Sequence, residues 1–346
     1  MSFSNIIKRY FSNIFISIVP ENDTYRIFSK VLKNGKLKEK FDKVFEVSVS
    51  DEKLHEDIEE YLISLQEKYN FAYISLYLDS MGQGAISGVD AGDFAKYSVD
   101  ITHVHIVKFK TWSAYASYID INWIKKVYSN VGLDFIYSPF VLLYFLLKEN
   151  KLCEYPTLYM LNLKDTFALA VFKEERLLFS AFFKLNNEEL IDAESVEDWE
   201  NEEEEKGVED LVSLDGSSEE EDLSDIEELN ELEELEELDD NIEDEIAGDD
   251  ESDNEYDDNS SVEEIELFGR DLQIYKYLKA FLKEYYTNPL YESDFINDII
   301  VYDSYEMSAE IINSIEYDLL LDIQMHKVDV AEKLCDLTIK EVYGGL

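Results

Sequence analysis

Residues 158–184 read LYMLNLKDTFALAVFKEERLLFSAFFK, and this stretch decides the expected fold. Three apolar runs are separated by two short polar turns, at 164–166 and 173–176. Short apolar runs bounded by polar turn residues are typical of buried strands. The stretch therefore predicts a three-stranded meander, and its first turn, Lys164-Asp165-Thr166, contains no glycine.

The first half of the chain repeats this order of elements. Its opening strand is expected at 13–19, and the turn PENDT (20–24) follows it. Val19 and Leu163, which end the two opening strands, are 144 residues apart, and both following turns are polar and end in Thr. Repetition of one supersecondary unit at this spacing predicts two similar subdomains that face each other across a cleft.

The remaining elements are predicted from periodicity and turn signals. In the first half we expect strands at 25–32 and within 36–49, joined by a Lys33-Asn34-Gly35 hairpin turn. A helix at 51–69, capped by Ser50 or Asp51, follows. The further expectations are a strand at 71–78, a glycine-containing loop at 79–97, strands at 101–109, 113–118 and 134–137, helices at 121–130, 140–148, 271–286, 309–314 and 330–340, and strands at 298–302 and 318–325.

Most of the net charge of −49 lies in one segment. Residues 188–266 hold 41 acidic residues and one basic residue, Lys206, so the rest of the chain carries only −9. Six apolar residues from Leu223 to Leu238 recur every third position, which makes them spiral around a helix instead of forming a coiled-coil seam. We expect a disordered tract that serves as a spacer or binds a basic protein surface, and that repels nucleic acid.

The cysteine and hydropathy patterns exclude several classes. Cys153 and Cys335 are expected to be small buried apolar side chains, and with four scattered histidines they predict neither a disulfide framework nor a metal site. No apolar run reaches the roughly 18–20 residues of a membrane span. A cytoplasmic protein without a transmembrane segment is expected.

The paired meanders resemble the actin-like fold, a duplicated ribonuclease H-like α/β fold. Within it they are similar to the PilM and GspL cytoplasmic type of type II secretion and type IV pilus assembly proteins. The local match is 158–184, with a charged hairpin ahead of LLFS, and the Ser138-Pro139 helix start fits the crossover helix of that family. A likeness to ε-proteobacterial transformation (competence) proteins is also suspected.

The resemblance implies a division of the chain. Residues 1–137 would form the first lobe, and 138–187 the crossover helix and opening meander of the second. Residues 188–266 would be the acidic insertion, and 267–346 the remainder of the second lobe.

In ATP-binding members, glycines in the first turn of each half let backbone N–H groups approach phosphate. The corresponding turns here would place Asp23, Thr24, Lys164, Asp165 and Thr166 near a Mg-ATP molecule. All five are also ordinary turn residues, and we favour that interpretation. The glycine pair expected after the late strand is replaced by Asp303-Ser304-Tyr305. No catalytic residue, metal or cofactor is therefore predicted.

Two further motifs each have a functional and an ordinary structural explanation. The loop with Gly82, Gly84, Gly88 and Gly92 follows an expected strand, as a phosphate loop would. However, no capped helix is expected directly after it, and no Lys-Ser/Thr pair occurs. A connecting or partner-binding loop is therefore favoured over a phosphate loop. His103 and His105 would share one face of a strand, where a structural or surface role is favoured over metal binding.

The leading expectation is a non-catalytic scaffold of a type II secretion, type IV pilus or DNA-uptake (competence) machine. It would be cytoplasmic and peripheral at the inner membrane, docked onto the tail of an inner-membrane partner. Two alternatives stay open. One is an active actin-like ATPase with degenerate phosphate loops, and the other is an acidic adaptor that acts through 188–266.

Overall fold

The computed structural model describes residues 11–22, 24–47, 53–150, 153–185 and 258–344. The described residues within Met1–Leu190 and Glu264–Leu346 form one compact unit. This unit contains two five-stranded sheets and one small sheet. Predictions about the acidic tract lie almost wholly outside the described residues.

The first sheet begins with the meander β1 (Ser12–Glu21), β2 (Thr24–Lys33) and β3 (Lys36–Glu46). Its three strands are antiparallel, and β4 (Phe71–Tyr77) and β8 (Phe135–Tyr137) then add in parallel, giving the order β3-β2-β1-β4-β8. Asn34 and Gly35 both have positive φ, which matches the predicted tight hairpin turn.

The second sheet repeats this plan, as the matched sequence patterns predict. Its meander consists of β9 (Thr157–Asn162), β10 (Thr166–Lys173) and β11 (Arg176–Lys184), with β12 (Asp298–Asp303) and β13 (Asp322–Lys327) added in parallel. The order β11-β10-β9-β12-β13 is that of the first sheet. The duplication is therefore real at the level of topology.

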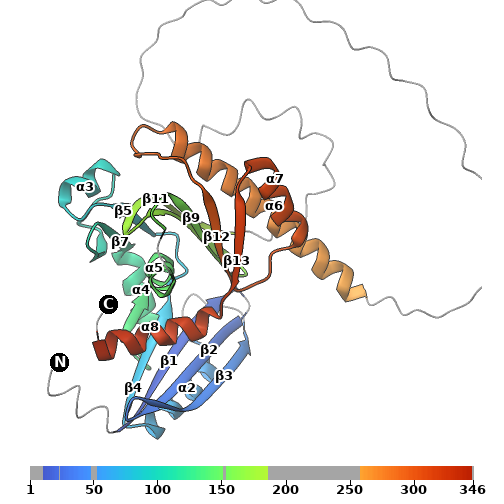
Figure 1. Ribbon diagram of the computed structural model, residues 1–346. Helices are drawn as coiled ribbons and strands as arrows, with labels where there is room; N and C mark the ends of the chain where they lie inside the picture. Colours follow the sequence, from blue (N-terminus) through green and yellow to red (C-terminus); the bar gives the residue numbers. More distant parts are fainter. Residues whose placement is uncertain (1–10, 23, 48–52, 151–152, 186–257, 345–346) are drawn as a thin grey trace, which may run out of the picture. The chain divides into compact units, whose positions relative to one another are not determined.

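Each sheet is covered by helices on both faces (Figure 1). Alternate residues of β1 divide between two cores: Ile14 packs with α2 (Glu56–Lys68), whereas Phe15 packs toward α8 (Val330–Gly344). The helix α4 (Tyr118–Val127) lies on the α2 side, and its partly buried Ile124 and Val127 pack into that core. On the second sheet, α6 (Asp258–Thr287) and α7 (Ala309–Leu319) pack on one face, and α5 (Pro139–Glu149) contacts β9 and β10.

The helix α5 is apolar on all sides because it is buried on all sides. Every residue from Pro139 to Leu147 is buried, and the helix contacts α8 as well as the second sheet. Ser138 and Pro139 begin it, as predicted. One continuous core thus joins both sheets through α5 and α8.

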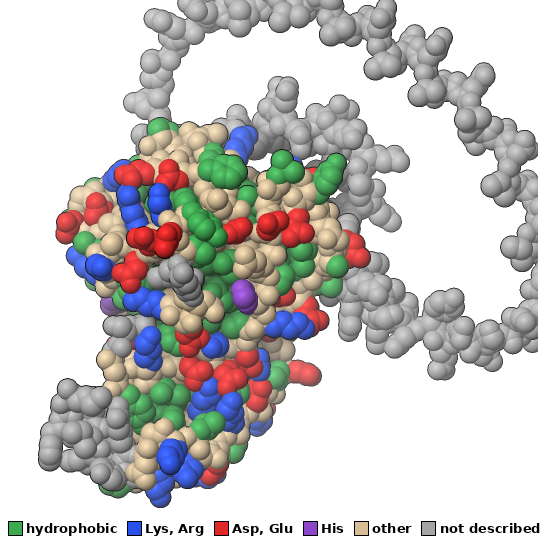
Figure 2. All heavy atoms as spheres, in the orientation of Figure 1, with side chains coloured by type: hydrophobic (Ala, Val, Ile, Leu, Met, Phe, Trp, Pro, Cys, Tyr) green, Lys and Arg blue, Asp and Glu red, His purple; other side chains and the backbone are tan. Residues whose placement is uncertain are grey.

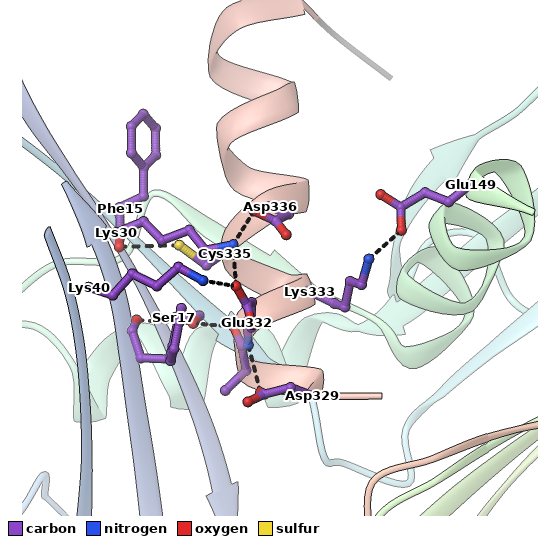
Figure 3. A network of polar contacts seen from close by, with 12 residues as sticks. Phe15, Ser17, Lys30, Lys40, Glu149, Asp329, Glu332, Lys333, Cys335 and Asp336 are labelled. Carbon is purple, nitrogen blue, oxygen red and sulfur yellow. Dashed lines mark hydrogen bonds and ion pairs between the residues drawn. The ribbon is translucent and has the colours of Figure 1, made fainter. Parts of the chain in front are cut away.

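A polar network fixes α8 on the first sheet (Figure 3). Lys30, which is buried in β2, donates to Asp336 at 2.5 Å and lies 2.9 Å from Glu332. Lys40 of β3 also pairs with Glu332, and Ser17 Oγ donates to the Ala331 carbonyl at 2.6 Å. The C-terminal helix is therefore held to the N-terminal sheet by both charge and burial.

Several sequence expectations are wrong in detail. The stretch 79–97 is not a loop: it contains β5 (Gln83–Ser87) and α3 (Ala91–Lys96), and β5 forms the small sheet β5-β7-β6 with β7 (Trp112–Ser117) and β6 (Val104–Lys108). Gly84 sits inside β5 because a Cβ there would lie 2.5 Å from Tyr115 Oη, so this glycine serves packing.

Three boundaries also differ. The helix α2 begins at Glu56 and is capped by His55, whose Nδ1 accepts the Asp57 N–H at 3.3 Å, so a cap at Ser50 or Asp51 is wrong. Residues 318 and 319 end α7, so the last strand starts only at Asp322. The helix α6 begins at Asp258, thirteen residues before the predicted start at 271 and inside the span 188–266 that was expected to be disordered.

Candidate functional site

The first turns of the two meanders meet directly. The Asn22 backbone N–H donates to Asp165 Oδ2 at 2.7 Å. Asp165 is buried, with 4% of its surface exposed, and its own carbonyl accepts the Leu185 N–H at 2.8 Å. The two turns that the sequence singled out are thus joined to each other by a hydrogen bond across the halves of the chain.

The other predicted residues lie around this contact. Thr24 begins β2, and its hydroxyl is 3.4 Å from Glu21 Oε2. Thr166 is buried at the start of β10, and its carbonyl accepts the Leu163 N–H at 2.9 Å. Asp23 lies outside the described residues. Pro20 and Glu21 belong to β1, so the first turn is shorter than the expected PENDT.

A buried arginine that sequence reasoning missed occupies the inner side of the second turn. Arg270 of α6 donates from Nε to the Lys164 carbonyl at 2.8 Å and from Nη2 to the Leu163 carbonyl at 2.5 Å. Nη2 also lies 2.5 Å from Asn162 Oδ1. This turn therefore presents carbonyl oxygens to a cation that belongs to the protein.

Two carboxylates balance the buried guanidinium. Asp271 Oδ1 lies 3.1 Å from Arg270 Nη1, and Asp303 Oδ1 accepts the Asn162 amide at 2.8 Å. Burial lowers the pKa of Arg270, while Asp271 and Asp303 oppose that shift. Asp303 also accepts the Tyr305 and Met307 N–H groups, at the place where the glycine pair was expected.

The side chains that the first half of the chain places near these joined turns are acidic. Burial, followed by the nearby Asp165 charge, raises the pKa of Glu21 above its ordinary value. Burial likewise raises the pKa of Asp79, which follows β4, although Lys184 at 3.5 Å opposes the shift. Elsewhere, acidic and basic side chains are interspersed on the face seen in Figure 2.

A second feature is a groove of about 980 Å³ between the small sheet and the end of the first sheet. Strand β6 is the last in the order β5-β7-β6, and β8 is the last in β3-β2-β1-β4-β8. Within the described residues, each therefore has one edge that no strand pairs. The groove is lined among others by His105, Val107, Phe109, Phe135, Tyr137, Ser138, Val141 and Tyr144.

The groove combines apolar walls with sparse, mixed charge. Val107 is 53% exposed, and Ser138 Oγ is buried with no hydrogen-bond partner among the described residues. Glu175 lies 3.6 Å from Lys110 and 4.0 Å from Lys148, so part of the charge is already paired. Such a surface suits an apolar or mixed peptide better than a strongly charged ligand.

Of the two remaining motifs, only His105 lines the groove. His103 lies in a turn before β6 and pairs with Asp100, so the expectation that it shares a strand face with His105 is wrong. Contrary to expectation, a helix opens within the glycine-containing segment, at Ala91 after Gly88, and it includes Gly92. Asp93 accepts the N–H groups of Val89 and Asp90.

The structure also bears on the cysteines, the potential metal ligands and the membrane spans. Cys335 is fully buried as expected, whereas Cys153 is only half-buried. No group of three potential metal ligands occurs among the residues that the structure describes. In the same part of the chain, no helix has the length and apolarity to cross a bilayer.

Comparison with solved structures identifies the fold. A structure titled PilM–PilN type IV pilus biogenesis complex is 10% identical, with 96% of each chain covered and a TM-score of 0.50. A Bacteroides thetaiotaomicron protein with an actin-like ATPase fold and unknown function is 9% identical over 97% of this chain and 99% of that chain, with a TM-score of 0.44. EutJ from Carboxydothermus hydrogenoformans is 7% identical over 96% and 90%, with a TM-score of 0.41.

These likenesses concern the fold alone, and the PilM-type actin-like fold predicted from the paired meanders is confirmed. No protein with a curated description matches the sequence. Residues 11–144 match a Domain of unknown function (DUF8569), and residues 158–343 match a Domain of unknown function (DUF8341). Because the second match covers more than half of the chain, the protein belongs to the family described as Domain of unknown function (DUF8341).

Proposed function

We propose that this protein is a non-catalytic assembly scaffold that holds an extended segment of an inner-membrane protein in the groove between β6 and β8. The proposal rests on one observation. Within the described residues, β6 and β8 each have one edge that no strand pairs, and both strands line the same apolar groove. An extended peptide can add to such an edge through main-chain hydrogen bonds while its side chains enter apolar pockets.

The turns that would bind a nucleotide support a non-catalytic role. A phosphate loop needs backbone N–H groups that point at the anion. Here the Asn22 N–H is taken by Asp165, and the Leu163 and Lys164 carbonyls are directed at Arg270. The acidic side chains of Glu21, Asp79 and Asp165 would repel the phosphates. The residues present therefore fit Mg-ATP poorly, and we propose that the protein uses no nucleotide.

The choice of a membrane partner rests on the fold. The PilM–PilN structure is a type IV pilus biogenesis complex that contains a protein of this fold. We extend that setting to this chain as a component of a pilus, type II secretion or competence machine. It would lie at the cytoplasmic face of the inner membrane and be attached through the tail of its partner.

Site-specific photo-crosslinking in cells tests the docking site. Benzoylphenylalanine at Val107, in the groove, should crosslink to an extended tail of one inner-membrane protein, identified by mass spectrometry. The matched control is Val44 on β3, which is 55% exposed against 53% for Val107 but lies outside the groove. Equal crosslinking of the same membrane protein from Val44, or none from Val107, would contradict the proposal.

A further inference from the structure

A separate cavity lies beside the two joined turns, and nothing in the proposed docking role uses it. It has a volume of about 340 Å³, within the range of small-ligand pockets. Its walls come from the β1–β2 turn, the segment after β4, and α4, with Lys184 contributed by the end of β11. The lining includes Tyr25, Tyr77, Asp79, Ser80, Met81, Asp120, Trp123, Tyr128 and Lys184.

Two carboxylates are held in the wall of this cavity. Asp120 Oδ2 accepts the Ser80 hydroxyl at 2.7 Å, and a Cβ on Gly82 would lie 2.3 Å from the same oxygen. The Asp120 carboxylate thus packs against the Gly82 backbone and has a fixed position. Asp79 is the second carboxylate, and Lys184 at 3.5 Å is its cationic neighbour.

The balance of charge around the cavity is negative. Among the described residues of the lining, Lys184 is the single cation, against Asp79 and Asp120. Lys126 lies nearby, 5.0 Å from the centre of the Trp123 ring, but it is not part of the lining. Behind the wall, Asp165 adds a further negative charge that acts on Asp79. A cation entering the cavity would meet more carboxylate than ammonium.

Four aromatic side chains also line the cavity, beside aliphatic residues such as Leu76, Ile124 and Val127. Tyr25, Tyr77 and Tyr128 are each at most 4% exposed, whereas Trp123 is 41% exposed. The faces of aromatic rings attract cations, by about 0.5–2 kcal/mol per contact, and sites that combine aromatic rings with carboxylates select organic cations.

We propose that this cavity binds an organic cation, a guanidinium or alkylammonium group, with Asp79 and Asp120 as its ionic partners and Trp123 as an aromatic contact. The cavity adjoins Pro20 and Asn22 of the first turn, for which the resemblance implied a nucleotide, but its carboxylates favour the opposite charge. The group can come from a free small molecule or from an Arg or Lys side chain of a partner. This inference does not depend on the docking groove.

The test is a titration of the full chain with L-argininamide, followed by calorimetry and by two-dimensional NMR of tryptophan indole signals. The neutral isostere L-citrullinamide is the matched control ligand. Argininamide should bind saturably and shift the Trp123 signal, and citrullinamide should bind at least tenfold more weakly. The Asp79→Asn and Trp123→Leu variants should each weaken argininamide binding at least fivefold, whereas Asp57→Asn, on exposed α2, should leave it unchanged.

Two outcomes would overturn the proposal. One is equal affinity for the two amides, which would remove any role for positive charge. The other is no saturable binding of argininamide by a chain that is folded by circular dichroism. A capped Ala-Arg-Ala tripeptide then distinguishes the sources: binding as tight as that of argininamide assigns the site to a partner side chain, and much weaker binding assigns it to a free molecule.

Discussion

At the scale of single residues, the structure is governed by buried charges that the sequence pattern did not reveal. Arg270 and Asp303 are distant in sequence and are joined only through Asn162. Hydrophobic periodicity identifies residues that face a core, but it carries no information on which buried polar groups will pair. Asp165 was singled out as a turn residue, whereas its partnership with Asn22 depends on the meeting of two halves.

Replacing Arg270 should destabilise the fold strongly. Arg270→Met leaves Asn162, Asp271 and two turn carbonyls without their donor, and breaking a buried pair costs about 3–5 kcal/mol. Urea denaturation measures this loss. Arg176→Met is the control, because Arg176 is 50% exposed and pairs with the exposed Glu292, so it should change stability by less than about 1 kcal/mol. Similar losses in both variants would refute the buried network as the reason.

Glu332 should contribute stability that depends on pH. Hydrogen bonds from Lys40 and then Lys30 lower the pKa of Glu332 from 4.5 to about 2 in the folded protein. Because the folded pKa is the lower one, the contribution is complete above about pH 4.5 and is lost as pH falls toward 2. Glu332→Gln should therefore lower the melting temperature at pH 7 but change it little near pH 2. An equal effect at both values would argue against the ion pairs.

At the scale of elements, strands and apolar helices were predicted well and short segments were not. The continuous buried run of β1 follows from burial on both faces of its sheet, and that of α5 from burial on all sides of the helix. The segment 79–97 was assigned to a loop because glycines usually break elements. Gly84 instead allows β5 to pass close to Tyr115, a tertiary reason that one sequence does not display.

Two glycines near α3 should respond oppositely to alanine. Gly88 has φ of +106°, and a Cβ there would lie 2.2 Å from Asp93 Cγ, so Gly88→Ala should destabilise the protein by about 1–3 kcal/mol. Gly92 lies in the first turn of α3 with no atom within 4 Å of an added Cβ. Gly92→Ala should therefore stabilise the protein slightly, by up to about 1 kcal/mol. Thermal unfolding of both variants measures these changes in stability. A lower melting temperature for Gly92→Ala would contradict the open space described at this position.

At the scale of the whole molecule, the paired meanders predicted the duplicated fold because topology follows from element order. The groove and the cation cavity were not predictable, since each combines side chains from segments far apart in the sequence. The groove joins the edges of two different sheets. The cavity joins the β1–β2 turn, α4 and Lys184. The sequence did indicate that the first turns lack glycine, which is the starting point of the non-catalytic proposal.

The central claim, an actin-like assembly protein that works without a nucleotide, is tested most directly by titration calorimetry of the full chain with Mg-ATP. The account predicts no binding tighter than about millimolar, because the Asn22 N–H is committed to Asp165 and the surrounding carboxylates repel phosphate. Binding of Mg-ATP below about millimolar that is abolished by Asp165→Ala would contradict it.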